Sequence, residues 1–140
     1  MLLDDALAVE LGATVHGAVT DVQVHADGYK KSISSPGIGN YLTFAKAVAR
    51  AVRAIGEEPI RRRSFVQAHG TGTPQNRTSE SQILSRVAGA FGIEDWPVAA
   101  IKCFVGHTMA AAGGDQLAST LGVFARGILP GIATIDEVAA

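Results

Sequence analysis

The chain has 140 residues, of which 47% are hydrophobic and 18% are charged, and its formal net charge is −1. These values are typical of a folded globular chain rather than a disordered one, and we expect a single domain over residues 1–140. The balanced charge gives no reason to expect a nucleic-acid partner, and the RRR run at 61–63 is interpreted as a solvated turn.

The cysteine count and the hydrophobic pattern restrict the kinds of protein and of metal site that this chain can form. Cys103 is the single cysteine, which excludes an internal disulfide and any multi-cysteine metal site. No apolar run reaches the ~18 residues that span a bilayer, and the acidic start MLLDDALAVE lacks the basic region of a signal peptide. We therefore expect a cytoplasmic protein with no membrane partner and no metal.

The first elements in chain order are a helix, a strand and a loop. Residues 2–13 repeat apolar side chains at helical spacing, and Gly12 marks a plausible end of that helix. Valines alternate through 14–26, which predicts a strand. Residues 27–40 are rich in Gly, Ser and Lys and are predicted to form a long loop.

The clearest amphipathic helix is predicted over 40–56, where apolar residues recur at steps of three and four. Asn40 is its expected N-cap and Gly56 its expected end. A short strand is predicted over 64–68, and a further amphipathic helix over 77–92.

The last part of the chain repeats this alternation. We predict a third strand over 96–102, a helix rich in small residues over 110–127 and an extended piece over 128–136. Strands separated by helices favour an α/β layered fold with a mainly parallel sheet.

Two histidines follow predicted strands in similar contexts. His69 precedes a Gly/Thr loop, and His107 opens the small-residue helix. Parallel strands end at one edge of the sheet, where such folds bind ligands, so both imidazoles are expected there. They suit proton transfer or hydrogen bonding to a developing oxyanion. Lys102 ends the strand before His107, and its charge would keep the imidazoles neutral and able to donate through N–H.

These residues also have plainer interpretations. A histidine at a strand end is usually a hydrogen-bonding surface residue, and Lys102 could be solvated. A metal site that adds Glu80 or Asp115 to the histidines is a further alternative, although Lys102 would oppose a cation. The HGTGTP segment at 69–74 lacks the lysine and spacing of a Walker A phosphate loop. Cys103 is interpreted as a small buried residue rather than a reactive thiol.

The segments AHGTGTP at 68–74 and IKCFVGHTMAAAG at 101–113 together resemble the C-terminal half of β-ketoacyl synthases. These condensing enzymes of fatty-acid and polyketide synthesis belong to the thiolase superfamily, and their usual motifs are HGTGTP or HGTSTP and VKSNIGHT. The resemblance runs through nearly the whole chain. It implies a thiolase-like layered αβα half-fold with a mixed, mainly parallel sheet, truncated at both ends.

The resemblance also implies roles for particular residues. His69 and His107 correspond to the family's two active-site histidines, which bind the thioester carbonyl and assist decarboxylation of the malonyl extender. Lys102 corresponds to the active-site lysine, and Glu80 to the acidic residue that pairs with it.

The loop threonines point to the carrier of the substrate. By the same resemblance, Thr71 and Thr73 correspond to residues that hydrogen-bond the phosphopantetheine arm of the acyl carrier. The expected partners are then acyl carrier protein or CoA thioesters, and no further cofactor is implied.

The chain departs from the family pattern at two segments, and two family features lie outside it. Residues 75–77 read QNR where the family commonly has a small residue followed by Gly-Asp, and Cys103 and Phe104 replace the Ser-Asn of KSNIGH. The family's nucleophilic cysteine lies in the N-terminal half. Its GFGGTN-like loop, which helps to form the oxyanion hole, follows the segment where this sequence stops.

These departures define the expected function. We predict a partial β-ketoacyl synthase that carries the His/His/Lys half-site, lacks the cysteine nucleophile and does not condense alone. Exposed edges and apolar faces should favour a homo-oligomer or a cysteine-bearing N-terminal half as partner. Two alternatives remain: a non-catalytic module that binds an acyl carrier or pantetheine, and an interaction remnant with idle site residues.

Overall fold

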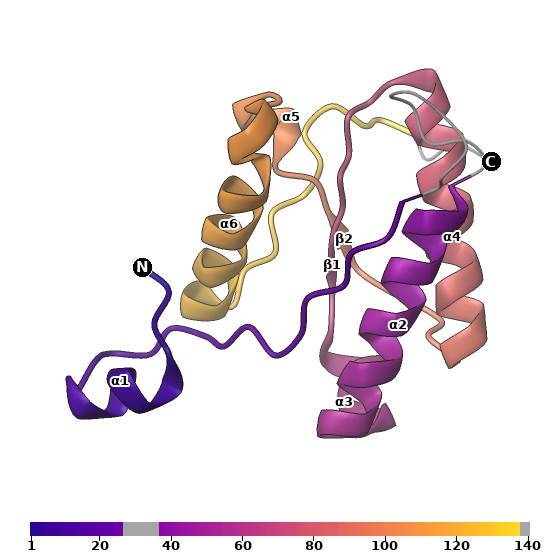
Figure 1. Cartoon of the computed structure of the whole chain (residues 1–140). Helices are drawn as coiled ribbons and strands as arrows, with labels where there is room; N and C mark the ends of the chain where they lie inside the picture. Colours follow the sequence, from indigo (N-terminus) through magenta and orange to yellow (C-terminus); the bar gives the residue numbers. More distant parts are fainter. Residues whose placement is uncertain (27–36, 138–140) are drawn as a thin grey trace.

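The computed structural model describes residues 1–26 and 37–137. Its elements are α1 (Asp5–Glu10), α2 (Ile38–Ile55), α3 (Glu57–Arg63), β1 (Val66–Gln67), α4 (Pro74–Phe91), β2 (Val98–Ala99), α5 (Lys102–Val105), the 3-10 helix η1 (Met109–Ala111) and α6 (Ala112–Arg126). Figure 1 shows the two strands between α6 on one side and α2 and α4 on the other. This is the layered αβα arrangement that was predicted.

The sheet is short and parallel, with Val66 opposite Val98 and Gln67 opposite Ala99. The Ala68 N–H continues the pairing by donating to the Ala99 carbonyl oxygen at 2.8 Å. The connection between the strands contains α4, as a parallel pair requires. Both strands therefore run towards the same edge, beyond which His69 and Lys102 follow.

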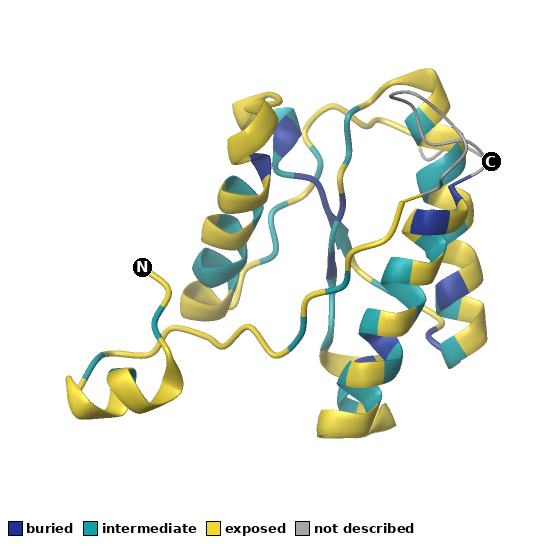
Figure 2. Cartoon of the chain, in the orientation of Figure 1, coloured by how far each residue is buried: buried dark blue, intermediate teal, exposed yellow. Residues whose placement is uncertain are grey.

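The hydrophobic core lies among helices α2, α3 and α4. Its fully buried centre is Val87 of α4, which packs with Val48 of α2, Ile60 of α3 and Ile93. Phe44 and Trp96 stack against this cluster with ring centroids 5.3 Å apart. Figure 2 shows the buried positions gathered on the inner faces of these elements and along the strands.

The predicted helices are present, with shifted starts. The helix expected over 77–92 begins earlier, at Pro74, because the Thr73 side chain accepts from the Asn76 N–H and proline fits the first turn. The helix expected from Asn40 begins at Ile38 with Gly37 as its N-cap, so the N-cap prediction was wrong. The expected loop at 27–36 lies outside the described residues.

The RRR run belongs to α3 rather than to the turn expected there. Arg61 and Arg62 form salt bridges of 2.8 Å with Glu57 and Glu58, one helical turn earlier. Acidic residues in the first turn and basic residues in the last also complement the helix dipole. The arginines remain exposed, as predicted.

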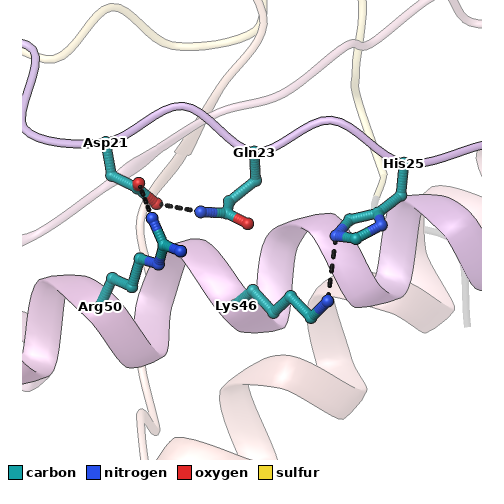
Figure 3. Close-up of polar contacts among 5 residues, drawn as sticks. All are labelled: Asp21, Gln23, His25, Lys46 and Arg50. Atoms are coloured by element: carbon teal, nitrogen blue, oxygen red, sulfur yellow. Dashed lines mark hydrogen bonds and ion pairs between the residues drawn. The ribbon is translucent and has the colours of Figure 1, made fainter.

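Residues 14–26 do not form the predicted strand. Their later part lies beside α2, where Asp21 accepts from Arg50 and from Gln23 at 2.7 Å each, and His25 lies 3.2 Å from the Lys46 ammonium (Figure 3). Val22 and Val24 are 72% and 83% exposed. The alternating residues therefore do point to two sides, but the polar residues Asp21 and His25 face α2 and the valines face outward.

The other predicted strands are shorter than expected. β2 stops at Ala99, and Lys102 opens the short helix α5 instead of ending a strand. The terminal piece, 128–136, contains turns and bends but no strand. Within the part of the chain that the structure describes, no helix has the length and apolar character needed to cross a membrane.

Candidate functional site

The loop after β1 is shaped by two glycines with left-handed backbone. Gly70 has φ 55° and Gly72 has φ 70°. A Cβ on Gly70 would lie 2.6 Å from Ala100 Cβ, which is too close for any side chain. The turn that presents His69 can therefore lie against the chain that follows β2 only because residue 70 is glycine.

Glu80 of α4 holds this turn in place. Its Oε1 accepts the His69 N–H at 2.7 Å, and its Oε2 accepts the Gly70 N–H at 2.9 Å. The same Oε2 accepts from the Asn76 amide at 2.7 Å. A carboxylate that accepts several N–H groups fixes both the strand-to-helix turn and the direction of the His69 side chain.

Lys102 lies beneath His69. It is the first residue of α5 and is only 8% exposed, and its ammonium nitrogen is 3.3 Å from His69 Nδ1. Because an ammonium group can only donate, Nδ1 must be the acceptor. The proton of the neutral His69 ring is therefore assigned to Nε2.

His107 is held in an equivalent state by the backbone. Its Nδ1 accepts the Met109 N–H at 3.0 Å, so the proton of the neutral ring again lies on Nε2. Met109 has φ 57°, a left-handed conformation that costs a side-chain-bearing residue free energy. The rings of His69 and His107 lie edge to face, with centroids 5.4 Å apart and an interplanar angle of 88°.

The electrostatics favour a neutral His69. Partial burial is the main cause that lowers its pKa from 6.5, and the Lys102 charge lowers it further. His107 acts in the same direction, while the Glu80 carboxylate opposes them. The net pKa shift is downward, so the ring remains a neutral donor to lower pH than an ordinary histidine.

The two threonine hydroxyls of the loop lie close together. Thr71 Oγ1 and Thr73 Oγ1 are 3.2 Å apart, and Thr73 also caps α4. Both residues lie in the loop between His69 and the start of α4. Their hydroxyls can donate and accept hydrogen bonds to a polar ligand.

Two contacts of α6 were not anticipated from the sequence. Gln116 donates to the Ala68 carbonyl oxygen at 2.6 Å and so ties α6 to the end of β1. Asp115 accepts from Thr108, next to His107. Their only signal in the sequence is a pair of polar residues at the start of a helix of small residues, which does not distinguish a contact from solvent exposure.

The structure does not bring Lys102 and Glu80 together. Lys102 and Glu80 form no ion pair among the described residues; Lys102 contacts His69, and Glu80 contacts the turn. Asp115, the alternative metal ligand, bonds Thr108, and no group of three or more His, Cys, Asp or Glu suited to a metal occurs in 1–26 and 37–137. Cys103 is a free, half-buried thiol in α5.

Comparisons with known proteins agree with this geometry. Residues 16–136 match the family described as β-ketoacyl synthase, C-terminal domain. The chain is 63% identical over 139 residues to β-ketoacyl-[acyl-carrier-protein] synthase FabY of Pseudomonas aeruginosa, covering 99% of this chain and 22% of that protein. It is 33% identical over 125 residues to atrochrysone carboxylic acid synthase PKS4 of Calonarius odorifer, covering 88% of this chain and 7% of that protein.

A solved structure shows the same fold. The crystal structure of the noncanonical ketosynthase FabY from P. aeruginosa matches with a TM-score of 0.92 and 64% identity, over 98% of this chain and 21% of that one. The chain thus spans about a fifth of the length of this relative. The predicted resemblance and the thiolase-like fold are confirmed, and the chain belongs to the β-ketoacyl synthase C-terminal domain family.

Proposed function

We propose that this chain supplies the two-histidine half of a β-ketoacyl synthase active site, where His69 and His107 bind the carbonyl oxygen of a malonyl thioester. One observation carries the proposal. Each Nδ1 is occupied as an acceptor, by Lys102 and by the Met109 N–H, so each neutral ring keeps Nε2–H for a ligand. Two such donors on perpendicular rings can converge on one oxygen.

The chemistry follows from this pair of donors. When a malonyl thioester loses carbon dioxide, the electrons of the breaking C–C bond move into the thioester and place negative charge on its carbonyl oxygen. His69 and His107 stabilise that enolate oxygen through their N–H groups without transferring a proton. The enolate carbon then attacks an acyl thioester, and the acyl group's thiolate leaves.

The acyl group itself needs a cysteine that we place outside these residues. Cys103 is the single cysteine here, and it lies in α5 next to Lys102 at the position that is Ser in the family motif. We therefore assign Cys103 no nucleophilic role and infer that another part of the ketosynthase provides the thiolate. On this proposal, residues 1–140 alone polarise a malonyl thioester but do not condense it.

The carrier is proposed to approach along the threonine loop. Thr71 and Thr73 present neighbouring hydroxyls beside His69, which suits the amides and hydroxyl of a phosphopantetheine arm. The similar FabY is named as an acyl-carrier-protein enzyme, which supports acyl carrier protein or CoA thioesters as partners of this chain.

Malonyl-thioester turnover tests the proposal. We would measure carbon dioxide release and carrier binding for the wild-type chain combined with a cysteine-bearing ketosynthase portion, and for His69→Ala, His107→Ala and Thr71→Val. Each histidine change should slow decarboxylation by roughly 10²–10³-fold, as loss of an oxyanion donor does. Unchanged rates in both histidine variants would contradict the proposal. Carrier binding that depends on Thr71 but never leads to turnover would instead identify a binding module.

A further inference from the structure

Asn76 makes a contact in the candidate site that the family pattern does not contain. The residue stands where the family commonly has glycine, and its side-chain amide donates to Glu80 Oε2 at 2.7 Å. The two residues are four apart on α4, the spacing at which helical side chains meet. Asn76 is itself fixed, because its own N–H donates to the Thr73 hydroxyl at 3.4 Å and its side chain is half-buried.

Glu80 has its charge compensated entirely by N–H donors. His69 N–H reaches one carboxylate oxygen, and the Gly70 N–H and the Asn76 amide share the other. No cation lies within ion-pair distance of Glu80 among the residues that the structure describes. Three donors of this kind can hold a carboxylate without a lysine.

Lys102 consequently has a different partner. Lys102 is only 8% exposed, and a buried cation needs acceptors. Were Glu80 to turn towards it, the two N–H groups of the His69–Gly70 turn would lose their acceptor. The Asn76 amide opposes that movement because it also holds Glu80 Oε2, and Lys102 remains directed at His69 Nδ1.

We propose that Asn76 is a positioning residue that holds Glu80 on the His69–Gly70 turn and so leaves Lys102 to hydrogen-bond His69. Asn76 acts through Glu80 and touches no substrate. The consequence for the reaction, a correctly oriented neutral His69, rests on the function proposed above. The hydrogen-bond arrangement itself does not.

The test uses the full chain and NMR signals that a purely structural role would not move. Asn76→Asp replaces the amide donor with a carboxylate facing Glu80, and Gln82→Glu makes the same chemical change at an exposed position of the same helix as a matched control. Asn76→Asp combined with Glu80→Gln restores a donor–acceptor pair in reverse. Asn76→Gly provides a milder loss of the contact.

We would record the amide proton shifts of His69 and Gly70, the imidazole titration of His69, and binding of a malonyl-pantetheine thioester. Asn76→Asp should shift both amide protons upfield and raise the pKa of His69, because Glu80 leaves the turn for Lys102. Asn76→Gly should move the same signals less, and the double variant should recover them in part. Gln82→Glu should move none of them.

The His69 signals and the thioester binding together distinguish a failure of the Asn76 positioning role from a failure of the proposed function. If Asn76→Asp and Asn76→Gly alter the His69 signals no more than Gln82→Glu does, Asn76 is not a positioning residue. If an Asn76 variant is less stable but keeps the wild-type His69 titration, its role is structural and the proposal fails. If the His69 signals respond as expected but the thioester never binds, the positioning role stands and the proposed function fails.

Discussion

Lys102 and His69 show how one buried cation sets the state of its neighbour. The ammonium group donates to Nδ1 and also lowers the pKa of the imidazole, so it fixes both the tautomer and the charge of the ring. The same lysine would repel any metal cation placed between the histidines. The two histidines are therefore best suited to donate hydrogen bonds from neutral rings without transferring a proton.

Replacing Lys102 with methionine should raise the pKa of His69. Methionine keeps the length of the side chain but removes the charge, while the burial that mainly lowers the pKa remains. A histidine with a lowered folded-state pKa binds fewer protons than in the unfolded chain, so stability falls as pH drops below 6.5. Lys102→Met should weaken that fall, which NMR titration and unfolding at several pH values would detect.

The opposite results would refute this assignment. A His69 titration that is unchanged in Lys102→Met would mean that the lysine does not act on the ring. Lys46→Met is the matched control, because Lys46 lies against His25 on α2 and should leave the His69 titration as it is in the wild type.

The sequence predicted which residues meet but not all of their bonds. His69, His107 and Lys102 could be placed together because each follows a strand, and parallel strands end at one edge. The partners of Glu80 could not be predicted, because the partner of a carboxylate depends on where the backbone N–H groups of the turn point. The contacts of Met109 and Gln116 involve backbone atoms, which a sequence pattern does not report.

At the scale of elements, the turn between β1 and α4 determines where His69 lies. Two left-handed glycines form it, but only Gly70 approaches another part of the chain. Gly70→Ala should lower the free energy of unfolding by about 2–4 kcal/mol, from backbone strain and from the clash with Ala100. Gly72→Ala should cost only about 1–2 kcal/mol, since open space surrounds a Cβ there.

Chemical denaturation of the two variants measures this difference. The comparison isolates the steric contribution, because both positions carry the same backbone penalty. Equal destabilisation of Gly70→Ala and Gly72→Ala would show that the turn does not lie against Ala100 as described.

Elements with a clear helical repeat of apolar residues were predicted correctly from the sequence. The long helices α2 and α4 were predicted because apolar residues recur on one face, and those faces meet in the core. Residues 14–26 show the limit of this reasoning: alternation indicates two different faces, but not which face is inside. Here Asp21 and His25 meet Arg50 and Lys46 of α2 through polar contacts (Figure 3), and residues 14–26 form no strand.

At the scale of the whole molecule, large apolar side chains remain uncovered on several elements. Val15 is 67% exposed and Phe124 of α6 is 59% exposed, and Figure 2 shows exposed positions along α1, residues 14–26 and the outer side of α6. Apolar surface spread over several elements favours association. The chain spans about a fifth of its relative FabY, which leaves ample further surface that such faces could meet.

Residues 1–140 in isolation should therefore self-associate. Light scattering at tens of micromolar should give a mass of at least a dimer, because burial of these faces is favourable at about 25 cal/mol per Å². Replacement of the self-associated species by a mixed complex on addition of a cysteine-bearing ketosynthase portion would support a shared surface. A monomer throughout this concentration range would contradict the prediction.

His69 and His107 are proposed to present two Nε2–H groups to one thioester carbonyl oxygen. Long-range ¹H–¹⁵N NMR of the imidazole rings at pH 7.5, before and after addition of a malonyl-pantetheine thioester, can detect both groups. We predict that both rings carry their proton on Nε2, and that both Nε2 signals shift together when the thioester binds. A proton on Nδ1 in either ring, or a thioester that shifts neither signal, would contradict the account.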